Sequence, residues 1–458
     1  MPIQTTRIKF LNDAEIRKGD YVLYWMQQSQ RAVYNHALEY AVQQANKQER
    51  MLLVVFSLTD DYPEANLRHC TFMLEGLKET RATLAARGIK MVLHRGHPPE
   101  TALSAGRRAS MIVCDRGYLK HQRAWRKHVA RRAKCPVVQV ESDVVVPVEV
   151  VSDKAEYAAR TIRPKIHRYL ATYLVGFRQT RIKHTSLGLK VKEINLDDIE
   201  NVLQNLNLDC SVPPISDLFK GGTCQAVNRF NRFIHHRLIH YDDHSNQPQT
   251  DDISHMSPYL HFGQISPLYL ALKISRAADA LNNLKEAYIE QLIVRRELAM
   301  NFAYYTSDYD AYTCIPGWAE KTLAEHDRDK RDYIYSRRQL ENAETHDEYW
   351  NASMLEMKHT GFMHNYMRMY WGKKILEWSE TPQKAFRTTL AINNKYFLDG
   401  RDPNSYTGVA WIYGVHDRAW SERSIFGKTR YMAASGLERK CDIAAYVKKV
   451  NDLVNRES

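Results

Sequence analysis

A chain of 458 residues is too long for one ordinary hydrophobic core and has the length of two or three domains. Lysine and arginine outnumber aspartate and glutamate by 65 to 53, and the net charge of +12 favours either a polyanionic partner such as nucleic acid or simple solubility. The seven cysteines are scattered and form no CxxC pair, which argues against a disulfide framework and against a zinc site.

The ends and the apolar stretches of the chain bear on its compartment. The first ten residues, MPIQTTRIKF, are charged and hold no apolar segment, so we expect no signal peptide. No stretch reaches the roughly 18 uninterrupted apolar residues of a membrane span. We therefore expect a protein that is not secreted, has no membrane partner, and works in the cytoplasm, associated with the nucleoid, or in the nucleus.

The first third of the chain alternates apolar runs with helical patterns. In the amphipathic segment after the first run, Ser29 is the predicted N-cap of a helix. This alternation predicts an α/β domain with a Rossmann-like, doubly wound parallel sheet, although the GxGxxG fingerprint of dinucleotide sites is absent. The predicted strands are the runs at 21–26, 51–58, 90–96, 110–115 and 137–142.

Beyond about residue 150 the strand signals fade and helical periods dominate. We predict an α/β domain over residues 1–180, a linker over 181–220, and a larger all-α domain over 221–458.

A predicted helix at 284–305 carries three adjacent charges, Arg295, Arg296 and Glu297, within an apolar pattern. Three successive residues span most of a helix circumference, so at least one of the three should face the interior. A buried guanidinium needs an anionic partner, which could be a phosphate-bearing ligand or an intramolecular ion pair.

Two polar segments interrupt the helical region. DISHMSPYLHFGQISP, at 252–267, groups Ser254, Ser257 and Ser266 around a turn that could hold a phosphate or could merely cap helices. NNKYFLDGRDPNSYTGVAW, at 393–411, is either a ligand-binding loop or an ordinary turn.

The segment HHRLIH contains His235, His236 and His240, of which the last two would share one helix face. No glutamate stands where a zincin needs one and no third ligand is near, so we expect no bound metal. The absence of a GxSxG elbow and of a P-loop counts against a hydrolase and an NTPase.

Three of the eight tryptophans, Trp350, Trp371 and Trp378, fall within one short region. Trp371 and Trp378 are two helical turns apart, about 10 Å along a helix axis. Indoles at such separations can pass an electron by hopping, or they can simply fill a core. The spacing alone leaves both interpretations open.

Long blocks of the sequence resemble the photolyase and cryptochrome family, and specifically its class II cyclobutane pyrimidine dimer photolyases. The resemblance extends over nearly the whole chain, and only the region near 185–230 is undistinguished. The blocks include EYAARTIRPKIHR, MSPYLHFGQIS, LIVRREL, HDEYWNASMLEM, MHNYMRMYW and LDGRDPNSYTGVAW.

The resemblance implies a flavin enzyme that repairs ultraviolet-damaged DNA with blue light, its FAD held by the helical domain. The salt bridge lining the isoalloxazine would be Arg368 with Asp399, and Asn393 would face the reactive nitrogen of the ring. The N-terminal domain would hold a deazaflavin or folate antenna chromophore, or none. The implied FAD contacts are Tyr241, Ser254, Ser257, Arg296, Asn365, Arg368, Asn393 and Asp399.

The resemblance also implies how the enzyme would meet its substrate, double-stranded DNA containing pyrimidine dimers, as a monomer. The dimer would leave the base stack and be repaired by an electron from excited reduced FAD. Trp411 and Met369 would line the pocket for the flipped lesion. The implied relay for photoreduction runs from Trp371, next to the flavin, to Trp350, with Trp378 and Tyr335 as accessory members.

Two positions depart from the family pattern. Gln291 stands where the class usually has a glutamate that contacts the dimer, and an arginine often found near Ser245 is absent. Gln291 favours a second hypothesis, a cryptochrome-like photoreceptor with weak or no repair. Because the chain ends soon after its helical region, we expect no long signalling tail, which favours repair.

Overall fold

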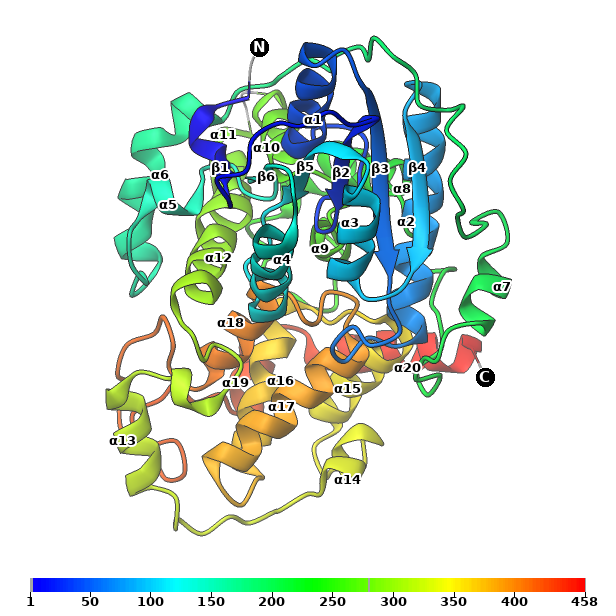
Figure 1. The fold of residues 1–458 in the computed structure, drawn as a ribbon. Coiled ribbons are helices and arrows are strands. Elements are labelled where there is room, and N and C mark those ends of the chain that lie inside the picture. Colours follow the sequence, from blue (N-terminus) through cyan, green and yellow to red (C-terminus); the bar gives the residue numbers. More distant parts are fainter. Residues whose placement is uncertain (1–2, 279–280, 458) are drawn as a thin grey trace. The chain divides into compact units, whose positions relative to one another are not determined.

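The computed structural model describes residues 3–278 and 281–457 (Figure 1). The chain forms two compact units, each assembled from three segments. The segments of unit 1 are Met1–Asp153, Pro164–Asn231 and His255–Ala277, and those of unit 2 are Lys154–Arg163, Arg232–Ser254 and Ala278–Ser458.

Unit 1 is built on a six-stranded sheet in the order β1-β6-β5-β2-β3-β4. All neighbouring strands are parallel except β1 and β6, which pair antiparallel at one edge. The five predicted apolar runs are all confirmed as strands, whereas the short and largely exposed β1 has no apolar run to reveal it. The strands are β1 (Ile8–Phe10), β2 (Tyr21–Met26), β3 (Met51–Leu58), β4 (Lys90–Arg95), β5 (Ala109–Asp115) and β6 (Val137–Val140).

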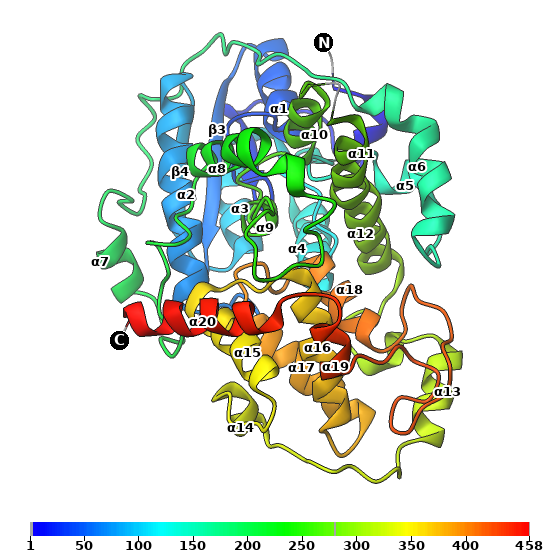
Figure 2. The same ribbon diagram turned by 180° about the vertical axis from the view of Figure 1, so that it is seen from behind.

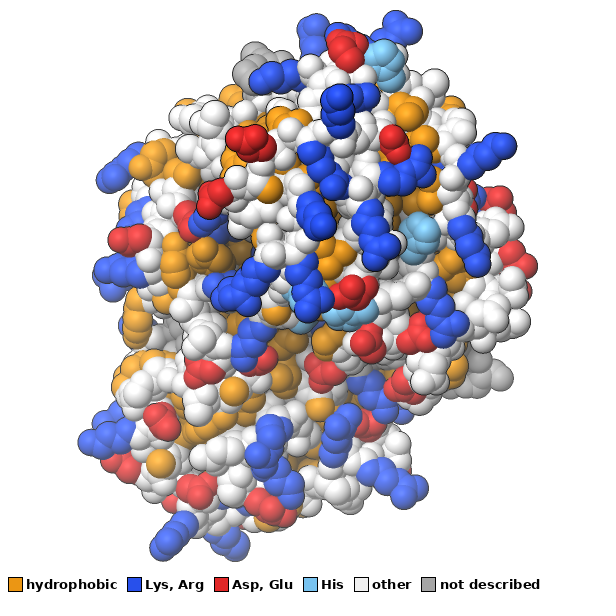
Figure 3. Space-filling view, in the orientation of Figure 1, with side chains coloured by type: hydrophobic (Ala, Val, Ile, Leu, Met, Phe, Trp, Pro, Cys, Tyr) orange, Lys and Arg blue, Asp and Glu red, His pale blue; other side chains and the backbone are white. Residues whose placement is uncertain are grey.

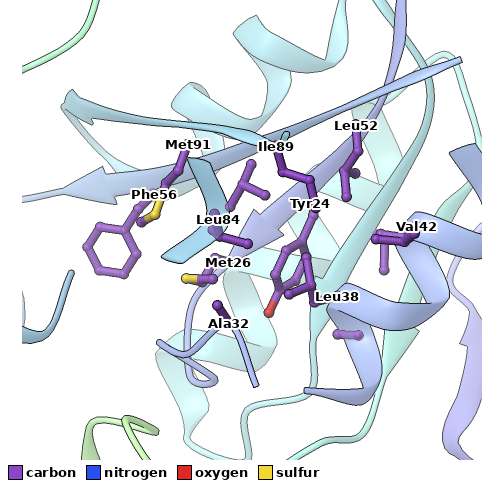
Figure 4. Close-up of a cluster of buried hydrophobic side chains, with 14 of the residues drawn as sticks. Tyr24, Met26, Ala32, Leu38, Val42, Leu52, Phe56, Leu84, Ile89 and Met91 are labelled. Carbon is purple, nitrogen blue, oxygen red and sulfur yellow. The ribbon is translucent and has the colours of Figure 1, made fainter. Parts of the chain in front are cut away.

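The two faces of the sheet bury separate cores, as a doubly wound fold requires. Along β2, Val22, Tyr24 and Met26 belong to one core, and the alternate residues belong to the other. Figure 4 shows part of the first core, in which Leu38 and Leu84 come from helices α1 and α2. The predicted α/β class of this part of the chain is therefore confirmed.

The helices up to residue 277 cover this sheet or follow it along the chain. The predicted cap at Ser29 is wrong, because α1 begins later and the Asn35 side chain accepts the Leu38 N–H at its start. Ser29 instead donates its hydroxyl to Asp143 at 3.0 Å. The helices are α1 (His36–Lys47), α2 (Leu67–Ala86), α3 (Pro98–Gly106), α4 (Lys120–Arg132), α5 (Val148–Val151), α6 (Ala159–Tyr173), α7 (Ile199–Gln204), α8 (Thr223–His236), α9 (Ser257–His261) and α10 (Pro267–Ser275).

After residue 281 the described chain is helical, which confirms the predicted all-α character of this region. In unit 2, α15 contacts both α16 and α20, and α20 crosses in front of it in Figure 2. No helix in the described ranges has the length and apolarity to cross a membrane. The helices are α11 (Asn282–Ile289), α12 (Arg296–Tyr305), α13 (Gly317–Glu325), α14 (Arg337–Glu341), α15 (Glu348–Thr360), α16 (Asn365–Glu377), α17 (Pro382–Tyr396), α18 (Pro403–Ile412), α19 (Ala434–Glu438) and α20 (Ile443–Glu457).

The structure corrects two expectations about helix geometry. The predicted helix at 284–305 is helical throughout, but its middle turn, Glu290–Arg295, is a π-helix between α11 and α12. The shared helix face expected for His236 and His240 is wrong, because α8 ends at His236 and a 3₁₀ turn, Leu238–His240, follows.

Candidate functional site

Arg368 and Asp399 form a half-buried ion pair in unit 2. Arg368 lies on α16 and donates from Nη2 to Oδ2 of Asp399 at 3.0 Å. Its Nε donates to the Met363 carbonyl at 3.0 Å, and its guanidinium lies 3.9 Å from the centre of the Phe397 ring. These three contacts fix the plane of the guanidinium, and Asp399 keeps a second, buried oxygen without a partner among the described residues.

Two asparagines that are close to this pair in the sequence differ in exposure: Asn393 is buried and Asn365 is exposed. Asn393 is buried at the C-terminal end of α17, and its amide nitrogen donates to Asn394 at 2.9 Å and to Ser405 at 2.5 Å. Both amide hydrogens are thus committed, and the carbonyl oxygen is the group left for a ligand. Asn365 is exposed at the first position of α16.

The serines of the 252–267 segment have three different settings. Ser254 accepts a hydrogen bond from the Tyr288 hydroxyl at 3.2 Å, and the Tyr288 ring lies 5.5 Å from that of Tyr241. Burial raises the pKa of Tyr241 to about 12, so this phenol stays protonated and can donate a hydrogen bond. Ser266 is the N-cap of α10, which makes the capping interpretation correct for this residue. Ser257 begins α9 in unit 1, whereas the other implied FAD contacts lie in unit 2.

The charged triplet Arg295–Glu297 lies where the π-helical turn meets α12. Arg296 and Glu297 are buried on α12, and Arg295 is half-buried. The prediction that at least one of these charges faces the interior is confirmed.

Glu290 links two arginines beside Trp411. Arg163 donates two hydrogen bonds to the Glu290 carboxylate, at 2.9 and 2.7 Å, and Arg295 donates a third at 3.2 Å. The bonds from Arg163, with the charge of Arg295, hold the pKa of Glu290 below its usual range. The guanidinium of Arg295 lies 5.7 Å from the Trp411 ring centre. Gln291, the next residue on the π-helical turn, is exposed.

The implied relay residues are in contact inside unit 2. The Trp350 indole donates from Nε1 to the Trp371 carbonyl at 2.9 Å, and its ring centre lies 5.6 Å from that of Trp378. Trp378 in turn lies 5.4 Å from Tyr335. The three indoles are at most 2% exposed, whereas Tyr335 is half-buried, so the chain of rings runs from the interior towards solvent.

Sequence reasoning missed residues whose partners are distant along the chain. Phe397 contacts both Arg368 and Trp371, with 6.3 Å between the Phe397 and Trp371 ring centres, and so joins the ion pair to the indoles. Arg163 reaches Glu290 across 127 positions.

Positive charge is concentrated on one face of α4 in unit 1. Lys120, Arg123, Lys127 and Arg131 are exposed and recur at helical spacing. Figure 3 shows the corresponding cluster of blue side chains over this helix. This face accounts for part of the net positive charge seen in the sequence.

Comparison with known proteins shows what this chain and its fold resemble. A family model described as DNA photolyase matches residues 22–183. A protein of Methanothermobacter thermautotrophicus named deoxyribodipyrimidine photo-lyase is 48% identical over 454 residues, covering 99% of this chain and 100% of that one. The solved class III photolyase of Agrobacterium tumefaciens superimposes with a TM-score of 0.72 at 16% identity, covering 95% of this chain and 87% of its own.

A second solved structure, an archaeal photolyase from Sulfolobus tokodaii with two FAD molecules, matches with a TM-score of 0.70 at 15% identity over 93% of this chain and 89% of that one. The doubly wound sheet followed by the helical region is thus the photolyase and cryptochrome fold. An identity of 48% over the full length is stronger evidence of family membership than a shared fold. The chain belongs to the DNA photolyase family.

Proposed function

We propose that this protein is a class II photolyase, an FAD-dependent lyase that uses blue light to repair cyclobutane pyrimidine dimers in DNA. The relative at 48% identity, named deoxyribodipyrimidine photo-lyase, supports this activity over a photoreceptor role. The observation that carries the proposal is the Arg368–Asp399 pair, which keeps a buried oxygen without a partner among the described residues. Phe397 joins this pair to the chain of indoles.

The residues fit an isoalloxazine ring. Buried polar atoms in proteins nearly always have a hydrogen-bond partner. Asp399 Oδ1 and the indole nitrogens of Trp371 and Trp411 are buried and have none among the described residues. An isoalloxazine carries both N–H donors and carbonyl acceptors, so a bound ring could satisfy such atoms.

Bound FAD would supply the light-excited electron donor of the reaction. The role of Arg368 is to hold positive charge beside the ring, which stabilises added negative charge there. Asp399 orients that guanidinium and would accept from a ring N–H. Tyr241, kept protonated by burial, would donate a hydrogen bond to an acceptor of the cofactor. Arg296 would supply positive charge from α12 for the pyrophosphate.

The surface around Trp411 is suited to a pyrimidine dimer flipped out of the base stack. Its half-buried indole offers an apolar wall, and the positively charged guanidinium of Arg295 lies beside it. Met369 is half-buried on α16 and can adapt its shape to a ligand. Gln291 is exposed on the π-helical turn and can donate a hydrogen bond to a base carbonyl, although it cannot give up a proton as a carboxylic acid can.

Cofactor content tests the proposal. The purified protein should be coloured by FAD, released on denaturation at about one per chain, and protein stripped of flavin should recover its colour with added FAD. A colourless protein that cannot be reconstituted would refute the flavin site and with it the proposed function.

A further inference from the structure

At the surface end of the indole chain, Tyr335 is hydrogen-bonded to a histidine. The Tyr335 hydroxyl lies 2.8 Å from Nδ1 of His346. The backbone N–H of the same histidine donates to the Tyr335 oxygen at 3.0 Å. The imidazole is exposed and stacks on the Tyr333 ring, with 3.7 Å between centres and 17° between planes. One residue therefore contacts the phenol oxygen at two points.

The double contact sets the direction of the phenol proton. Because the Tyr335 oxygen accepts from the backbone N–H of His346, its own hydrogen is free to point at the Nδ1 atom. A neutral imidazole with its proton on Nε2 presents a lone pair there. The backbone N–H remains to stabilise the oxygen after the proton has left. The arrangement therefore serves proton transfer from Tyr335 as well as simple packing.

The Tyr335 ring also packs against one of the buried indoles, that of Trp378. Its ring is perpendicular to that of Trp378 at 5.4 Å, and its backbone N–H donates to the Trp378 carbonyl at 3.2 Å. Among the described residues whose rings link to Trp350 through Trp378, Tyr335 has a hydroxyl with a titratable base as its partner. An oxidised phenol is a very strong acid, so a phenol loses its electron far more readily when a base takes the proton.

We propose that His346 accepts the proton of Tyr335 when Tyr335 is oxidised by the indole radical cation of Trp378. The step deepens the proposed function, on which it rests, because the oxidant that first removes an electron from the indoles is the light-excited oxidised isoalloxazine. One electron passes from Tyr335 to Trp378, restoring the neutral indole. The O–H bond of Tyr335 breaks and an N–H bond forms at Nδ1 of His346. The products are a neutral tyrosyl radical and an imidazolium.

The transfer makes charge separation long-lived. An indole radical cation can take its electron back from the flavin, whereas a neutral tyrosyl radical must first recover its proton. Since His346 is exposed, the imidazolium can release that proton to water. External reductant then has time to reach Tyr335 and return it to the phenol, which leaves the electron on the flavin.

The step depends on pH through the imidazole. Once His346 is protonated, Nδ1 can no longer accept, so the tyrosyl radical should form less and decay sooner as the pH falls. The titratable groups around His346 are Tyr333 and Tyr335 from the preceding loop and the sequence neighbours Asp347 and Glu348. Lys374 on α16 lies 5.6 Å from the centre of the Trp378 ring, and that centre lies 5.2 Å from the centre of the His346 ring. Lys374 is paired with Glu377 at 2.7 Å, and Asp347 accepts the Tyr370 hydroxyl, so neither competes for the Tyr335 proton.

Transient absorption after a laser flash on the FAD-loaded protein tests the step. His346→Asn keeps a hydrogen-bond acceptor but cannot take a proton, and should shorten the life of the charge-separated state about 100-fold, the lower range for a positioned proton acceptor. It should also abolish the solvent deuterium effect and the pH dependence, as should Tyr335→Phe. The matched control Tyr333→Phe keeps the ring on the imidazole and should change neither. Added imidazole should restore the lifetime in His346→Ala.

A second measurement needs no flavin. A ruthenium polypyridyl photo-oxidant in solution can oxidise the flavin-free protein, and electron paramagnetic resonance should then find a tyrosyl signal that Tyr335→Phe removes and His346→Asn reduces. A protein that binds no FAD but gives this result would refute the proposed function and would still support the proton transfer from Tyr335 to His346. Equal tyrosyl yield and equal pH dependence in wild type and His346→Asn would overturn the inference, with FAD bound or not.

Discussion

Asp399→Asn tests the flavin-side ion pair, and its effect can be estimated from the two carboxylate oxygens. Oδ2 accepts from Arg368 at 3.0 Å, while Oδ1 is buried without a partner among the described residues and is available to a ligand N–H. Asparagine has one oxygen. Since arginine can only donate, the oxygen will turn to Arg368 and the amide hydrogens will face the ligand donor.

The substitution therefore replaces one charge-assisted hydrogen bond to the cofactor with a contact between two donors. Hydrogen bonds to charged groups contribute about 1.5–3 kcal/mol, so we expect a loss of about 2 kcal/mol in FAD binding. This free energy corresponds to a dissociation constant raised about 30-fold. The Asp399 side chain is only 10% exposed, so water cannot easily compensate the loss.

The assay is titration of flavin-free protein with FAD, followed by flavin fluorescence. The matched control is Glu341→Gln, which removes a similarly buried carboxylate whose partners among the described residues are Lys395 at 2.8 Å, Arg337 and Tyr396, and not Arg368 or Asp399. The control should lose fold stability but keep its FAD affinity. An Asp399→Asn protein that binds FAD within about twofold of wild type would refute the assignment of Oδ1 to the cofactor.

Three further predictions concern the relay, the fold and one buried acid. Trp371→Phe should block photoreduction of oxidised FAD yet leave repair by chemically reduced protein at the wild-type rate; normal photoreduction would exclude the relay. Gly263→Ala should lower the free energy of unfolding by about 1–3 kcal/mol and so lower the urea midpoint, because φ at Gly263 is +63° and the new Cβ would lie 1.7 Å from the Gln28 carbonyl oxygen. An unchanged midpoint would contradict this strain. Burial raises the pKa of Glu356, which accepts the Tyr446 hydroxyl at 2.6 Å. The folded protein therefore holds a proton that the unfolded chain has lost once the pH exceeds the usual carboxyl range, and stability falls as the pH rises through that window. Glu356→Gln should have the same melting temperature as wild type at acidic pH and a higher one at neutral pH. A difference in melting temperature that does not change with pH would disprove the coupling.

The fold of unit 1 could be predicted because its signals are local. Each parallel strand is buried on both faces and therefore reads as a continuous apolar run. Local signals also explain the failures. Ser29 precedes an amphipathic segment, as a cap should, but its backbone N–H binds Asp115 and its hydroxyl binds Asp143, so the helix begins only after Asn35. Nothing near Ser29 in the sequence reveals those two carboxylates.

The candidate site was only partly accessible from the sequence. Physical reasoning could predict a buried charge at Arg296 or one of its neighbours. It could also place Trp371 and Trp378 two turns apart on one helix, because each pattern lies within a single helical run. Contacts between separate segments carry no such period. The pairing of Tyr335 with His346 joins a loop to a helix start, and no spacing rule predicts it.

Repair of a defined lesion tests the proposed function most directly. An oligonucleotide with one thymine dimer, mixed with FAD-loaded reduced protein, should regain intact thymines under blue light and stay damaged in the dark. A matched oligonucleotide with a (6-4) lesion should stay damaged in both conditions. A protein that binds and photoreduces FAD but leaves the thymine dimer unrepaired in the light would contradict the lyase and point to a photoreceptor.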